Sequence, residues 1–178
     1  MLETVHLKKN YERTCRLQKL LRKLYLVSTG ERCTAALNNQ GKTLKDFFNS
    51  ISDEKAMYAY AVGKWTMKEM LQHMIDTERI FAFRALVIAR KETVTLPGFD
   101  ENVYAVNSFA NRRTWANLVD EMKIVREATT LLFKSFTDDM LNTTGNFSAA
   151  TATVNIIGSI IVGHFYHHVN ITNERYLK

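Results

Sequence analysis

Proline and glycine are scarce in this chain. Its 178 residues include one proline, Pro97, and seven glycines. These two residues usually separate short strands, whereas most of this chain spaces its apolar residues three or four apart, as amphipathic helices do. The scarcity therefore argues against a protein of many short strands and predicts an all-α fold.

Cysteine and long apolar runs are also nearly absent. Cys15 and Cys33 belong to no C-x-x-C motif, which argues against a disulfide framework or a thiolate zinc site. No run reaches the roughly 18 to 20 apolar residues of a membrane span, and the N-terminus shows no secretory signal. We therefore expect a cytoplasmic protein without a membrane partner.

Positive charge is concentrated at the N-terminus. The formal net charge is +6, and residues 1–32 carry eight Lys or Arg against three Glu. The rest of the chain is almost neutral, so a basic N-terminal helical extension (1–30) is expected to precede one helical bundle (31–178). The basic segment also spaces four leucines as an apolar stripe, which favours a docking helix over a nucleic-acid arm.

Four long helices are expected. A capping box formed by Thr66 and Glu69 marks the start of the second helix, whereas Asn38-Asn39-Gln40-Gly41 would bend or break the first. Thr137-Asp138-Asp139 opens a short additional turn before the last helix. The predicted helices lie within residues 10–51, from Thr66 to about Arg90, at about 112–135 and at about 153–175.

The segment 91–112 joins the second and third helices and contains the only proline. It has no sustained helical or strand period, and it is too long for a structureless loop inside a compact domain. We expect it to cover a site or to form a crossover connection.

Three of the five histidines fall on predicted inner helix faces. His164 and His168 are four residues apart, which places both imidazoles on one face of a helix and lets two ligands share one metal ion. His73 lies on the inner stripe of the second helix. A buried imidazole needs a partner, because an unbonded buried polar group costs ~1 to 3 kcal/mol. The spacing favours a divalent metal with an open position, and hydrogen bonds to carbonyl or carboxylate oxygens are the alternative.

A few other side chains are weaker candidates for the site. Arg84 lies near the inner stripe, where a buried guanidinium needs an anion, and Asp100 or Glu101 would supply it. The same residues would alternatively bind a substrate carboxylate. Tyr104 is a candidate hydrogen-bond donor, with packing as the alternative, and Trp65 is expected to act as a hydrophobic staple at the second helix.

Several motifs taken together resemble a known family. They are G-K-W-T-x-x-E, L-Q-H-M-I-D-T-E-R with F-R-A-L-x-I-A-R after it, L-P-G-F-D-E-N-x-Y, and G-H-F-Y-H-H with a terminal E-R-Y-L. Over about residues 35–178 the chain is similar to the DinB/YfiT-like metal-binding superfamily. The resemblance implies a four-helix bundle with a long crossover connection, often dimeric, in which His73, His164 and His168 hold a divalent metal.

The resemblance also implies an activity. Characterised branches include S-transferases that use bacillithiol or mycothiol, and the F-R and G-F-D-E segments are most similar to the bacillithiol branch. A cation with an open position favours deprotonation of a bound thiol. The same position would alternatively activate water, because zinc lowers the pKa of its bound water to roughly 7.

We therefore expect a metal-dependent S-transferase that uses a low-molecular-weight thiol and a small-molecule substrate. The alternatives are a metal-dependent hydrolase and a non-catalytic metal- or ligand-binding stress protein. Nitrogen-only ligation suits zinc or nickel first, with iron and copper as further candidates. A homodimer is expected, and nucleic acid is not an expected partner.

Overall fold

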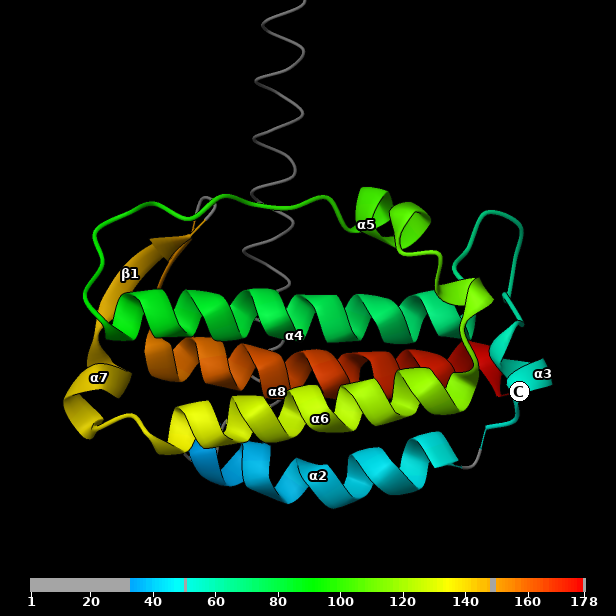
Figure 1. Cartoon of the computed structure of the whole chain (residues 1–178), viewed down its shortest axis with the longest axis horizontal. Helices are drawn as coiled ribbons and strands as arrows, with labels where there is room; N and C mark the ends of the chain where they lie inside the picture. Colours follow the sequence, from blue (N-terminus) through cyan, green and yellow to red (C-terminus); the bar gives the residue numbers. More distant parts are fainter. Residues whose placement is uncertain (1–32, 50, 148–149, 178) are drawn as a thin grey trace, which may run out of the picture.

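Four long helices pack side by side in the computed structural model (Figure 1). The structure describes residues 33–49, 51–147 and 150–177, so the predicted N-terminal extension lies outside the described residues. The predicted all-α four-helix bundle is confirmed. Its long helices are α2 (Cys33–Asn49), α4 (Met67–Ala89), α6 (Trp115–Lys134) and α8 (Val154–Ile171).

The order of the helices requires one long connection. In Figure 1, α4 and α6 begin at the end of the bundle where α2 and α8 finish. Because α4 and α6 are parallel neighbours, the chain must return along the whole bundle between them. The crossover predicted at 91–112 is therefore present, and it contains helix α5 (Glu101–Asn107) and the 3-10 turn η1 (Ala110–Arg112).

Threonine is the N-cap residue of four described helices. The Thr66 hydroxyl accepts a hydrogen bond from the Glu69 amide (3.1 Å), and the Glu69 carboxylate accepts one from the Thr66 amide (2.8 Å), so the predicted capping box is confirmed. These bonds satisfy amide groups that the first turn of a helix leaves without partners. The N-caps of α6, α7 (Asp138–Asn142) and α8 are Thr114, Thr137 and Thr153.

Helix α2 is continuous through the segment 38–41, so the expected break is not present. Leu37, Leu44 and Phe48 are all buried against the rest of the bundle. The Gln40 amide also donates to the carbonyl oxygen of Val162 on α8, at 2.9 Å. These long-range contacts outweigh the low helix propensity of asparagine and glycine.

A small hairpin that the sequence did not predict joins α7 to α8. Strands β1 (Thr144–Phe147) and β2 (Ala150–Thr153) pair antiparallel, and Leu96 of the crossover forms a bridge with Phe147. The strands have four residues each, the shortest length at which an alternating pattern can indicate a strand. The remaining short elements are α3 (Asp53–Ala56) and the π-helical turn η2 (Thr172–Tyr176).

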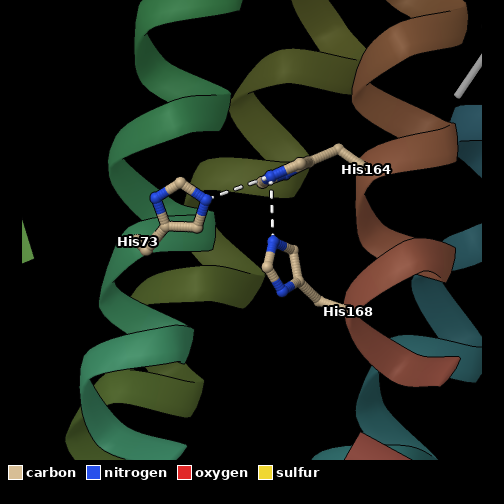
Figure 2. Close-up of side chains that lie close together, drawn as sticks. All are labelled: His73, His164 and His168. Carbon is tan, nitrogen blue, oxygen red and sulfur yellow. Dashed lines mark hydrogen bonds between the residues drawn. The ribbon is translucent and has the colours of Figure 1, made fainter. Parts of the chain in front are cut away.

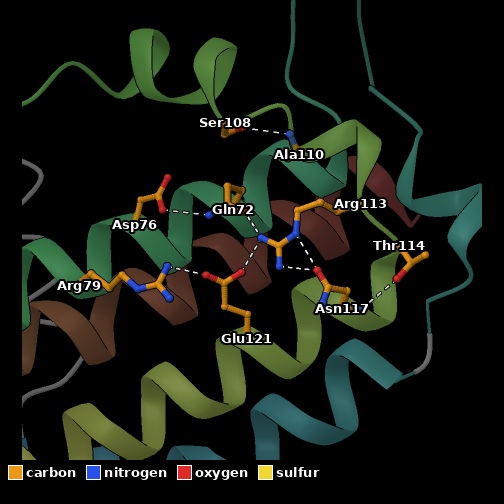
Figure 3. A network of polar contacts seen from close by, with 9 residues as sticks. All are labelled: Gln72, Asp76, Arg79, Ser108, Ala110, Arg113, Thr114, Asn117 and Glu121. Atoms are coloured by element: carbon orange, nitrogen blue, oxygen red, sulfur yellow. Dashed lines mark hydrogen bonds and ion pairs between the residues drawn. The ribbon is translucent and has the colours of Figure 1, made fainter.

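A polar network fastens the end of the crossover to two helices (Figure 3). Arg113 donates to Gln72 of α4 at 2.7 Å and to Asn117 of α6 at 2.6 and 2.8 Å. It also pairs with Glu121, which pairs in turn with Arg79 of α4. The network fixes the start of α6 against the turn of α4 that carries residue 73.

Candidate metal centre

Three histidine side chains converge between α4 and α8 (Figure 2). His73 lies near the start of α4, while His164 and His168 lie near the end of α8, and these two ends meet because the helices are antiparallel. The Nε2 atom of His164 is 3.2 Å from Nε2 of His73 and 3.0 Å from Nε2 of His168. One ring nitrogen of each histidine lies within 4.8 Å of the other two.

The predicted apolar stripe of α8 explains why two of these rings point inward. Ile157, Ile160 and Ile161 are buried on this stripe, and His164 and His168 continue it at the spacing of one helical turn. The three histidine side chains are only 8 to 9% exposed. The structure therefore brings together all three residues that the sequence selected as ligands.

Hydrogen bonds among the histidines cannot satisfy all three Nε2 atoms. A neutral imidazole nitrogen carries either one hydrogen or one lone pair, so Nε2 of His164 can bond to only one of its two neighbours. A divalent cation, in contrast, accepts a lone pair from each ring. Zinc–nitrogen bonds of about 2.0 to 2.1 Å in a tetrahedral arrangement place ligand nitrogens roughly 3.3 Å apart. The two spacings that involve His164 are close to this value, and the third pair of nitrogens lies within 4.8 Å, so these residues fit a metal ion.

Burial keeps the three imidazoles neutral. It lowers the pKa of His73 to about 4, and the pKa values of His164 and His168 lie well below the ordinary value. Desolvation is the largest cause at each ring, and repulsion from neighbouring cationic groups adds to it. Neutral imidazole is the form that donates a lone pair to a metal.

Two further residues contact the His73 ring, and the sequence did not assign either of them to the site. The Trp65 ring centroid is 4.9 Å from that of His73, so this side chain contacts the site, while its expected role as a staple stays a prediction. The Thr77 hydroxyl oxygen lies 3.4 Å from Nδ1 of His73. Within the described part of the chain, Nδ1 of His168 is the only fully buried side-chain nitrogen or oxygen without a hydrogen-bond partner.

A cavity of about 10 Å³ lies beside His164, close to the smallest volume that holds one water molecule. Its walls are mainly apolar, with Met74 and Phe165 among them, and Glu78 and Arg126 also contribute to them. The two charged residues form a buried bidentate ion pair between α4 and α6, with both bonds at 2.8 Å. This pair could not be predicted from the sequence because its members are 48 positions apart.

The weaker candidates have contacts of another kind. Arg84 is buried, donates to the Pro97 carbonyl oxygen at 2.8 Å and lies over the rings of Phe81, Phe99 and Phe147. It is eleven positions after His73, which is roughly 16 Å along a helix. The hydrogen bond found for Arg84 is to this carbonyl, and a contact of Arg84 with Asp100 or Glu101 stays a prediction.

Asp100 and Tyr104 belong to the crossover. The Asp100 carboxylate caps α5 by accepting from the amides of Asn102 and Val103. Tyr104 is 44% exposed, and its ring contacts that of Phe99. Neither residue lines the cavity beside His164, and their roles at the site stay predictions.

The fold and the site define a four-helix bundle with one long crossover and a three-histidine cluster between two antiparallel helices. Comparison with protein families is consistent with this class. The chain belongs to the DinB superfamily, whose family model matches residues 36–171.

Two known proteins are similar to this chain. Over 74 residues, 42% of the chain, it is 27% identical to a protein of Oceanobacillus iheyensis named as a candidate metal-dependent hydrolase, and it spans 40% of that relative's length. Its fold matches the solved structure of YfiT from Bacillus subtilis with a TM-score of 0.70 at 18% identity, covering 80% of this chain and 82% of that one. YfiT is described as a candidate metal-dependent hydrolase with an unusual four-helix bundle topology.

Among the helices of the described residues, none is both long and apolar enough to cross a membrane.

Proposed function

We propose that this protein is a divalent-metal-dependent enzyme whose metal ligands are His73, His164 and His168. The convergence of three buried, neutral Nε2 atoms carries the proposal. Three neutral protein ligands leave room for a further group in the coordination shell, as catalytic sites do. A divalent metal held here would act as a Lewis acid that polarises a substrate or activates a nucleophile.

Hydrolysis of a small molecule is the reaction class we favour. Both similar proteins carry the description of a metal-dependent hydrolase. The chain's own residues would hold the metal by three ring nitrogens, while the apolar side chains beside His164 limit the access of bulk water to the inner side of the site.

A thiol S-transferase is the second candidate, and the resemblance of the F-R and G-F-D-E segments to the bacillithiol branch supports it. These segments touch each other in the fold, because Arg84 lies over Phe99 and bonds to Pro97. However, Arg84 is roughly three helical turns from His73. The segments therefore attach the crossover to α4, which explains their pattern without a thiol.

The metal proposal is tested by elemental analysis of protein purified without a histidine tag. We expect about one divalent ion per chain in the wild type and loss of that ion in His73→Ala and His164→Ala. His167→Ala is the matched control, because this neighbour on α8 lies outside the cluster, and it should keep the metal. Full metal retention in both His73→Ala and His164→Ala would contradict the site.

The reaction class is tested with the metal-loaded protein. A hydrolase should cleave members of an ester and amide panel without added thiol and should stop when a chelator removes the metal. An S-transferase should instead consume a low-molecular-weight thiol only when an electrophile is present. Metal binding without either activity would favour the non-catalytic binding protein. The homodimer also stays a prediction, and sedimentation velocity tests it.

A further inference from the structure

The side chain of Thr77 contacts the candidate ligand His73 at Nδ1, the ring nitrogen that does not face the other two histidines. We propose that Thr77 is a positioning residue: its hydroxyl accepts the Nδ1 hydrogen of His73 and so directs the Nε2 lone pair toward the metal. This role rests on the proposed function, because Thr77 would hold His73, one of the three proposed metal ligands. Trp65 restrains the same ring from another side.

The helix places the two groups together. Thr77 follows His73 by four positions on α4, so both side chains share one face. The Thr77 oxygen is 3.4 Å from Nδ1, and the residue is only 4% exposed, which leaves its hydroxyl little access to bulk water. This distance is long for a hydrogen bond. Such contacts often tighten when the site is filled.

Other helical threonines use their hydroxyl groups differently. Those of Thr129, Thr130 and Thr172 donate to the carbonyl oxygen four positions earlier, at 2.8 to 2.9 Å. The contact found for the Thr77 hydroxyl is the imidazole instead. A hydroxyl group has one O–H donor and two lone pairs on its oxygen. The Thr77 hydroxyl can therefore accept the Nδ1 hydrogen while its own hydrogen remains available to donate.

Trp65 supplies a second restraint. Its ring lies against His73 with an angle of 44° between the two planes. The Trp65 carbonyl oxygen accepts a hydrogen bond from the Tyr176 hydroxyl at 2.8 Å, which ties its backbone to the last turn of the chain. With Trp65 against the ring and Thr77 at its Nδ1 edge, the imidazole has little freedom to turn.

The hydrogen bond has a chemical consequence. A neutral imidazole carries its single hydrogen on one of two nitrogens, and the group bonded to that nitrogen decides which one it is. In metal sites such partners fix the tautomer and the direction of the ligand, and their loss typically weakens metal binding by 10- to 100-fold. Thr77 would fix Nδ1–H and leave Nε2 free to bind, the nitrogen that faces His164.

The test compares three variants in metal-free protein titrated with Zn²⁺ against a competing chelator. Thr77→Val removes the acceptor at almost constant volume and should weaken Zn²⁺ binding by about 10-fold or more. Thr77→Ser keeps a hydroxyl and should restore most of the affinity. Thr129→Val is the matched control, since it removes a buried hydroxyl that bonds only to its own helix, and it should bind Zn²⁺ like the wild type.

Nitrogen-15 spectra of the histidine rings give a second readout that fold stability alone would not move. Metal-free wild type should show His73 protonated at Nδ1, and Thr77→Val should show a mixture of tautomers. Equal Zn²⁺ affinity and an unchanged tautomer in Thr77→Val would overturn the role of Thr77 and leave the metal site intact. If the wild type binds no divalent metal, the proposed function fails, and the spectra still decide whether Thr77 orients His73.

Discussion

The Glu78–Arg126 ion pair is the most deeply buried charge pair of the described chain, with the two side chains 3 and 4% exposed. The Arg126 guanidinium also donates to the side-chain oxygen of Gln40. Removing one charge from such a pair leaves the other desolvated and unpaired, whereas replacing both by apolar groups is often neutral.

We therefore expect Arg126→Met to lower the free energy of unfolding by roughly 3 to 5 kcal/mol. The double variant Glu78→Leu/Arg126→Met should recover most of this loss. Urea denaturation of metal-free protein measures both values. Lys123→Met is the control: it breaks a pair that is 33 and 69% exposed, so it should change stability by less than about 1 kcal/mol. A double variant no more stable than Arg126→Met would contradict this view.

The three candidate ligands could be selected from the sequence because helical spacing is a local property. His164 and His168 carry it within one helix, and His73 lies on an apolar stripe of its own. Trp65 could not be assigned to the site, because the direction of its ring depends on how the chain enters α4. Nor could Glu78, because its partner lies on another helix.

At the scale of elements, Gly158 allows α8 to approach α2 and α6 closely. A Cβ atom at this position would lie 2.7 Å from Sγ of Cys33 on α2 and 2.7 Å from Cε1 of Phe133 on α6. Helix propensity alone favours alanine over glycine by about 1 kcal/mol. Overpacking a core, in contrast, typically costs about 1 to 3 kcal/mol.

We expect the packing to dominate, so that Gly158→Ala lowers the unfolding free energy by about 1 kcal/mol. Ser159→Ala is the neighbouring control, since the Ser159 hydroxyl bonds to the carbonyl of Asn155 on its own helix. The unfolding free energy of this variant should be close to that of the wild type. Chemical denaturation of the three proteins makes the comparison. A Gly158→Ala protein more stable than the wild type would show that propensity prevails.

The boundaries of the elements were predictable where the signal was local. Thr66 and Thr137 were recognised as helix starts because a cap needs only its own first turn. The continuity of α2 through Gly41 was not predictable, since it depends on packing against distant parts of the chain. The pairing of β1 with β2 was not predictable either, because each strand has only four residues.

For the whole molecule, the topology followed from one long connection. A segment as long as 91–112 without a period argued for a crossover, and the fold uses it to set α4 parallel to α6. This arrangement places the start of α4 beside the end of α8, which is what brings His73 to the other two histidines. The sequence did not reveal which helix pairs touch, because every long helix has an apolar stripe.

The last prediction concerns the basic segment before the bundle. Residues 1–30 carry seven Lys or Arg against two Glu, so their removal changes the formal charge from +6 to +1. All three candidate metal ligands, His73, His164 and His168, lie after this segment in the sequence. We therefore expect the truncated chain to keep the metal content of the full chain.

DNA binding is measured on the same two proteins. Any affinity of the full chain for DNA should be weak, should fall steeply with salt and should vanish on truncation, because a nearly neutral bundle releases few counterions. DNA affinity that survives truncation at low salt would place the interaction on the bundle and overturn this division of the chain. Loss of metal on truncation would instead show that the segment supports the site.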